Sequence, residues 1–185
     1  MVSMKQRTTL VDEAKKAFLS INEEDIEMFA QHVLQARKIF IYGLGRERLM
    51  LKAFAMRLMH LGFDVHMVGD VTTPRITEKD LFITSSGTGY LSTVDALLKI
   101  VKNSGAKVVY MTADKTSSLV AYATQAIVIE AQTMKDEISN RQSLQPMGAV
   151  FEQAQLFLFE WLILVLKEIS NISDEEMEQY HTNLE

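Results

Sequence analysis

Hydrophobic positions in part of the chain recur at the period of a helix. In residues 23–36 the apolar side chains fall three to four positions apart, which places them on one helical face. Residues 46–62 and 90–105 are rich in helix formers, and each run ends in glycine, a frequent helix stop. The pattern predicts helices over 9–19, 23–36, 46–62, 90–105 and 148–170, a short helix over 117–123 and a helical acidic tail.

Short and continuously apolar runs alternate with these helices. They cover residues 38–43, 63–69, 80–86, 106–112 and 125–130. Continuous apolar runs are typical of strands that helices cover on both faces, whereas half-buried strands alternate apolar and polar residues. The alternation predicts an α/β fold, a doubly wound five-stranded parallel sheet flanked by helices in three layers, as in flavodoxin-like proteins.

The chain is long enough for one domain with a sizeable core, and its composition does not break along its 185 residues. We expect N-terminal helices over 1–36, an α/β core over 37–130 and C-terminal helices over 148–185. Residues 131–147 show no period and are predicted to form a long loop.

Composition and charge exclude several functions. The net charge of −5 disfavours a broad nucleic-acid surface, so no nucleic-acid partner is expected. The absence of cysteine excludes disulfides, thiolate metal sites and a cysteine nucleophile, and it fits a cytoplasmic protein. The most apolar stretch, 156–166, is about half the length that spans a bilayer and contains Glu160, so it predicts a buried helix and no membrane partner.

Two strand ends carry glycine-containing turns that lead directly into helices. They read YGLGRERL over 42–49 and SSGTG over 85–89. Ligands of open parallel sheets bind beyond the carboxyl ends of the strands, where unpaired backbone N–H groups and the helix dipole attract anions. Because Ser86 and Thr88 add hydroxyl donors, the second turn predicts a phosphate site.

Other interpretations of these turns remain open. Ser and Thr also cap helices and Gly turns the chain, so the 85–89 turn fits a purely structural role equally well. The first turn has Arg48 where a dinucleotide fingerprint has its third glycine, which disfavours a dinucleotide site. Arg46 either pairs with a phosphate as a charged fork or is an exposed residue at the helix start.

Four segments together resemble the 6-phospho-3-hexuloisomerase family of sugar isomerase (SIS) domain proteins. They are KAFAMRLMHLGFDVHMVGD (52–70), SSGTG (85–89), QPMGAVFEQ (145–153) and HTNLE (181–185), and the likeness extends from about residue 5 to 185. The resemblance implies a five-stranded parallel sheet and interconversion of 3-hexulose 6-phosphate and fructose 6-phosphate in formaldehyde assimilation by the ribulose monophosphate pathway. It also implies a homotetramer without metal or organic cofactor, whose partner is a small sugar phosphate.

The resemblance assigns roles to individual residues. Glu152 aligns with the family's proposed catalytic glutamate, and His181 matches a histidine thought to reach the active site of a neighbouring subunit. Without the resemblance, Glu152 also fits an acid at a helix start with no catalytic task, and His181 fits a solvated residue of an acidic tail. The residues expected to hold the sugar phosphate are Gly45, Arg46, Ser85, Ser86, Gly87, Thr88 and Gly89.

The chain departs from the family pattern at two places. The phosphate loop, usually Ser-Gly-Ser-Gly-Glu-Thr, has Thr88, Tyr90 and Leu91 in place of Ser, Glu and Thr. In the first turn Glu47 and Arg48 replace Ser and Gly, and a carboxylate there repels a phosphate unless it points away or pairs with arginine. Three interpretations follow: a hexuloisomerase, an isomerase of another phosphosugar, or a binding protein without catalysis. His32, His60 and His66 are interpreted as structural, because none has a carboxylate at metal-ligand spacing.

Overall fold

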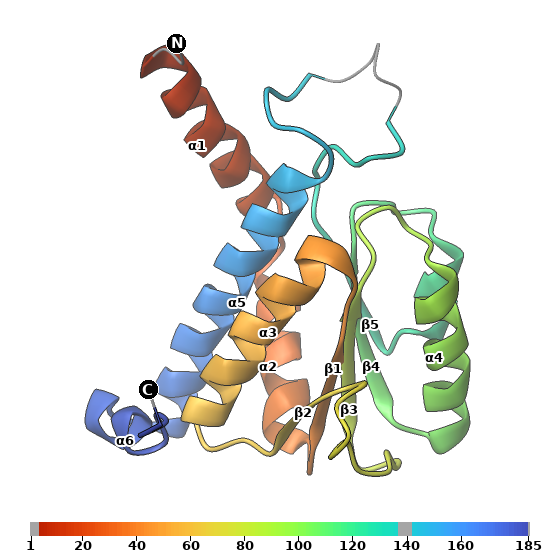
Figure 1. The fold of residues 1–185 in the computed structure, drawn as a ribbon, viewed down its shortest axis with the longest axis vertical. Coiled ribbons are helices and arrows are strands. Elements are labelled where there is room, and N and C mark those ends of the chain that lie inside the picture. The colour runs from red at the N-terminus through yellow and green to blue at the C-terminus, as the bar shows by residue number, and fades with distance from the viewer. Residues whose placement is uncertain (1–3, 137–141, 185) are drawn as a thin grey trace.

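The computed structural model describes residues 4–136 and 142–184. Its centre is a sheet of five parallel strands in the order β2-β1-β3-β4-β5, which confirms the predicted flavodoxin-like topology (Figure 1). The register pairs Phe40 of β1 with His66 of β2 on one side and with Phe82 of β3 on the other. The strands are β1 (Ile39–Tyr42), β2 (Val65–Met67), β3 (Leu81–Ser85), β4 (Lys107–Thr112) and β5 (Gln125–Val128).

Helices cover both faces of the sheet, as the apolar strands predict (Figure 1). One layer consists of α1 (Met4–Phe18), α2 (Glu23–Gln35), α3 (Gly45–His60) and α5 (Ala149–Ser170). The other layer consists of α4 (Ser92–Ser104) and the short 3-10 helix η1 (Ser118–Tyr122). The last helix, α6 (Asp174–Gln179), follows α5 and contacts α3.

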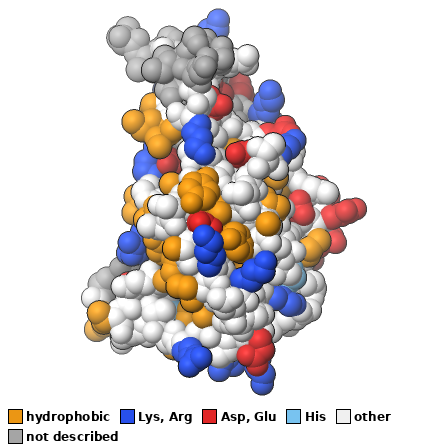
Figure 2. All heavy atoms as spheres, turned by 90° about the vertical axis from the view of Figure 1, so that its right-hand side faces the viewer, with side chains coloured by type: hydrophobic (Ala, Val, Ile, Leu, Met, Phe, Trp, Pro, Cys, Tyr) orange, Lys and Arg blue, Asp and Glu red, His pale blue; other side chains and the backbone are white. Residues whose placement is uncertain are grey.

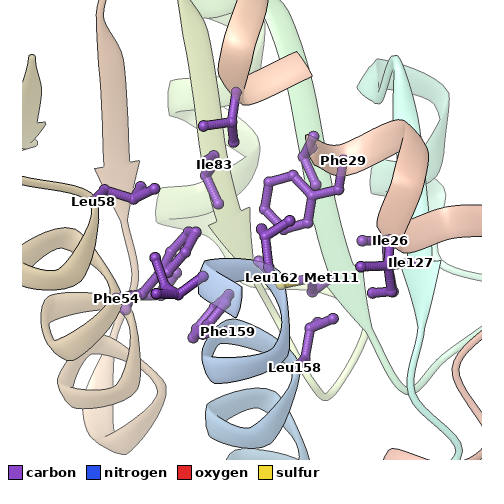
Figure 3. Packing of buried hydrophobic residues seen from close by; sticks show 14 of the residues in the cluster. Ile26, Phe29, Phe54, Leu58, Ile83, Met111, Ile127, Leu158, Phe159 and Leu162 are labelled. Atoms are coloured by element: carbon purple, nitrogen blue, oxygen red, sulfur yellow. The ribbon is translucent and has the colours of Figure 1, made fainter. Parts of the chain in front are cut away.

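The larger core lies between the sheet and the layer of α2, α3 and α5. The rings of Phe54 and Phe159 are stacked with their centroids 4.3 Å apart, and Phe29 meets Phe54 edge-on at 6.1 Å (Figure 3). Such aromatic pairs add to the stabilisation that burial of their area provides.

Among the described helices, α5 has the length and hydropathy to cross a bilayer, but 56% of that stretch is buried, as in a core helix.

The smaller core lies on the opposite face of the sheet, under α4. Phe82 and Tyr110 from the sheet pack there against Val94 and Leu98 of α4. Figure 2 shows the outer side of this layer, where hydrophobic side chains gather around an acidic and basic pair. Because helices cover both faces of the sheet, the carboxyl ends of its strands are the place where a ligand can enter.

Most observed elements end within two residues of the predicted bounds, and three elements depart from the prediction most clearly. Helix α1 is described from Met4, earlier than the predicted start at residue 9, and the hydroxyls of Thr8 and Thr9 donate to the carbonyls of Met4 and Lys5. Strand β2 is limited to Val65–Met67, since only β1 pairs with it at this edge. The predicted helix over 117–123 is a 3-10 helix.

Candidate active site

A cavity of about 310 Å³ opens at the carboxyl edge of the sheet, where α3 and α5 begin (Figure 1). Its wall combines the turn after β1, the loop after β3, the start of α5 and the segment before α5. It is lined by Leu44, Gly45, Arg46, Glu47, Gly87, Thr88, Leu91, Thr133, Met134, Pro146, Met147, Gly148, Phe151 and Glu152. Segments more than 100 residues apart in sequence therefore meet at the place where parallel sheets bind ligands.

The loop after β3 keeps its path because glycine occupies two crowded positions. A Cβ at Gly87 would lie 3.0 Å from the ring of Phe151. Gly89 has a φ of +83°, and a Cβ there would collide with the carboxylate of Asp114. From below, the buried Tyr110 hydroxyl donates to the Gly89 carbonyl at 3.1 Å. The loop is thus fixed in shape before any ligand arrives.

Glu47 reaches from the first turn of α3 into this loop. Its carboxylate accepts a hydrogen bond from the hydroxyl of Ser85 and one from the backbone N–H of Gly87, with 3.0 Å between nitrogen and oxygen. Burial raises the pKa of Glu47, the two hydrogen bonds oppose the rise, and the nearby Glu152 carboxylate adds to it. Glu47 therefore points into the loop, and the arginine beside it pairs with Glu152 instead, so Glu47 stands where a carboxylate repels a phosphate.

Glu152 lies in the first turn of α5 and faces Arg46 from the start of α3. Arg46 Nη1 and Glu152 Oε2 are 3.1 Å apart, and the Glu152 side chain is 14% exposed. Burial raises the pKa of Glu152, and the charge of Arg46 opposes that rise. The pair is close without the alignment of a hydrogen bond, so Oε2 keeps its capacity to accept a proton.

The predicted phosphate-binding residues divide into two groups. Gly45, Arg46, Gly87 and Thr88 line the cavity, as does the predicted base Glu152. The others lie behind its wall: the Ser85 hydroxyl is taken by Glu47, the buried Ser86 hydroxyl has no hydrogen-bond partner among the described residues, and Gly89 shapes the loop.

His181 lies far from the cavity of its own chain. Its ring stacks on that of His60 with the centroids 5.2 Å apart. His60 is the last residue of α3, whose 16 residues span about 24 Å, and the first turn of α3 lines the cavity. Figure 1 shows α6 and the C-terminus beside the other end of α3, away from that turn. One chain alone does not bring His181 to Glu152.

Sequence reasoning missed the contribution of the segment before α5. Thr133, Met134 and Met147 close one side of the cavity, although the segment has no pattern that marks it as part of a site. Phe151 was also missed, and its place one residue before Glu152 was the available signal. Within residues 4–136 and 142–184, no three His, Asp or Glu side chains are placed to hold a metal ion.

Comparison with known proteins assigns the family. Residues 32–159 match the SIS domain, and the chain belongs to this family. It is 34% identical over 176 residues to the 3-hexulose-6-phosphate isomerase of Bacillus subtilis, which covers 95% of each chain. It is 33% identical to the enzyme of that name from Mycobacterium gastri, over 94% of this chain and 87% of the other.

A solved structure agrees with this assignment. A hypothetical protein from Methanococcus jannaschii, whose crystal structure is reported to infer the function of a 3-hexulose-6-phosphate isomerase, superposes with a TM-score of 0.83 at 30% identity. The match covers 95% of this chain and 98% of the other. The SIS fold is thus shared over nearly the whole length.

Proposed function

We propose that this protein is a sugar-phosphate isomerase that interconverts 3-hexulose 6-phosphate and fructose 6-phosphate. The observation that carries the proposal is Glu152, a carboxylate of raised pKa that shares one cavity with Arg46 and the glycine loop. The named isomerase from Bacillus subtilis supports the substrate class, because the two chains match over 95% of their lengths.

The reaction moves a carbonyl from C3 to C2 of the sugar. A base removes the proton from C2, which gives a 2,3-enediol, and the protonated base, after exchange with water, delivers a proton to C3. A hydroxyl proton passes from O2 to O3, so the atoms balance without a cofactor. Glu152 suits the carbon-bound proton, because a general base works best when its pKa lies near the working pH. Arg46 holds the Glu152 carboxylate and contacts the sugar from the same side.

The phosphate of the substrate is assigned to the loop after β3. The Thr88 hydroxyl and backbone N–H supply donors ahead of α4, and the Gly87 N–H joins them when Glu47 releases it. The Gly89 N–H already donates to the Ser86 carbonyl at 2.9 Å. The hydroxyl protons are assigned to His181 of a second copy, since the side chain of the same chain lies at the other end of α3. The site is therefore complete only in an assembly.

We expect a homo-oligomer, with a tetramer as the assembly, in the cytoplasm. An apolar groove of about 460 Å³ runs along α5 beside the end of α1. Leu19, Phe157 and Leu164 in this groove are 65%, 49% and 64% exposed. Soluble proteins seldom leave large side chains exposed together unless another surface covers them. A second copy is the occupant that also supplies His181.

An activity assay tests the isomerase. Purified protein is incubated with 3-hexulose 6-phosphate, and fructose 6-phosphate is measured. We expect Glu152→Gln to lower turnover by about 10²- to 10⁴-fold, the usual contribution of a general base. Glu168→Gln, an exposed residue of the same helix, serves as the matched control and should leave the rate unchanged. No turnover by the assembled protein, or no effect of Glu152→Gln, rejects the proposal.

A second candidate function is phosphosugar binding without catalysis. The observation that favours it is Glu47, which already occupies a donor of the loop expected to hold phosphate. Thermal stabilisation by sugar phosphates without turnover supports this candidate. Turnover of a pentose or heptose phosphate in place of the hexulose phosphate points to an isomerase of another substrate.

A further inference from the structure

The phosphate loop of this protein already contains an anion of its own. The Ser85 hydroxyl and the Gly87 N–H both donate to the carboxylate of Glu47. Each of these groups has one hydrogen to give, so neither can serve Glu47 and a ligand phosphate fully at the same time. Glu47 and a ligand phosphate would therefore compete for the same two donors.

The surroundings show that this is a built arrangement. Ser85 is fully buried, and its hydroxyl finds its acceptor in Glu47. Next to it, the Ser86 hydroxyl is also fully buried and has no partner among the described residues. Buried polar groups are normally satisfied, so the Ser86 hydroxyl shows that the loop has hydrogen-bonding capacity that Glu47 does not use.

Charge makes the competition stronger. The titratable groups that act on Glu47 are Glu152 from α5 and the Tyr110 hydroxyl below the loop on β4, and Arg46 of the same helix lines the same cavity. Arg46 is already paired with Glu152 at 3.1 Å. Two carboxylates and one guanidinium leave the cavity with surplus negative charge when both acids are ionised, which opposes a phosphate dianion.

We propose that Glu47 is a resident competitor of the ligand phosphate: it holds the Ser85 hydroxyl and the Gly87 N–H in the free protein, and a phosphosugar must displace it to bind. This inference rests on the proposed function, since it assumes that the loop receives a phosphate. Glu47 thereby sets the affinity of the site for phosphorylated ligands. Protonation weakens Glu47 as an acceptor, so lowering the pH favours the ligand.

Calorimetric titration with fructose 6-phosphate and with inorganic phosphate tests the competition. We expect Glu47→Ser to bind both probes about tenfold more tightly near neutral pH, because one charge-assisted competitor is removed. Glu47→Gln keeps the shape of the side chain and should show a smaller gain, which keeps the test valid if the serine variant folds poorly. Glu27→Gln, an exposed acid on α2, is the control and should not differ from the original protein.

The pH dependence gives a second readout. As the pH is lowered, the affinity of the original protein should rise relative to that of Glu47→Ser, since the titration of the phosphate itself is common to both. Equal affinities and equal pH profiles in the two proteins, or weaker binding by both Glu47 variants, would overturn the inference. Tighter binding by Glu47→Ser without isomerisation by either protein would support the inference and reject the isomerase instead.

Discussion

Arg46 and Glu152 approach to 3.1 Å although they begin different helices, α3 and α5, more than 100 residues apart in the chain. The contact joins the turn after β1 to the helix that carries the proposed base. It opposes the rise that burial causes in the pKa of Glu152. The pair thus controls the pH range in which Glu152 can accept a proton.

Replacing Arg46 should shift the pH profile of the reaction. Arg46 lowers the pKa of Glu152, so Arg46→Ala raises it further. A base must be deprotonated to act, and we expect the acid limb of kcat/KM to move to higher pH by about one unit or less, because Arg46 is 58% exposed. Arg57→Ala, an exposed residue of the same helix, provides the control. An acid limb that stays in place contradicts the assigned role.

Tyr110 should stabilise the phosphate loop from beneath. Its hydroxyl donates to the Gly89 carbonyl at 3.1 Å and lies 3.2 Å from Ser117 Oγ. We expect Tyr110→Phe to lower the free energy of unfolding in urea by about 1–2 kcal/mol and to weaken phosphate binding. Tyr180→Phe, at an exposed position of the C-terminal region, should change neither quantity. An unchanged free energy of unfolding in Tyr110→Phe would contradict the stabilising role of the Tyr110 hydroxyl.

Alanine substitutions at Gly69 and Gly89 distinguish the cost of a positive φ from the cost of a steric clash. Gly89 and Gly69 both have positive φ, +83° and +103°, but a Cβ at Gly69 meets nothing within 4 Å whereas one at Gly89 meets Asp114. We expect Gly69→Ala to cost about 1 kcal/mol and Gly89→Ala clearly more, together with loss of ligand binding. Thermal and urea unfolding of the two variants measure the difference. Equal losses of unfolding free energy would mean that the Asp114 side chain moves aside at no cost.

The apolar groove along α5 should be covered in solution. Leu164→Glu places a charge in it, so we expect the assembly seen by sedimentation to dissociate. Turnover should fall with the assembly if His181 of a second copy serves the site. Ile100→Glu introduces the same charge on the exposed side of α4 and should leave the assembly intact. Dissociated chains with full activity would remove His181 from the mechanism.

Much of the fold follows from the sequence because burial leaves a plain pattern. Apolar runs such as 80–86 predict strands covered on both faces, and β3 is fully buried over Leu81–Ser85. The ends of elements were harder to predict. Lys5 to Thr8 are all polar, so the apolar period that predicts a helix gives no signal for the turns of α1 before residue 9.

The site was only partly predictable, because side-chain directions and contacts between distant segments leave no pattern in the sequence. The edge of the sheet, the glycine loop and Glu152 follow from topology and from the resemblance. The direction of the Glu47 side chain depends on torsion angles and on the position of Ser85, neither of which sequence spacing fixes. The place of His181 depends on how α6 packs against α3.

Deuterium exchange tests the central assignment most directly. Fructose 6-phosphate is incubated with the protein in heavy water, and deuterium at C3 is followed by NMR. If Glu152 moves the proton through a 2,3-enediol, the original protein incorporates deuterium at C3, and Glu152→Gln does so about 10²- to 10⁴-fold more slowly. Incorporation at C1 alone, none at all, or an equal rate in Glu152→Gln would contradict the account.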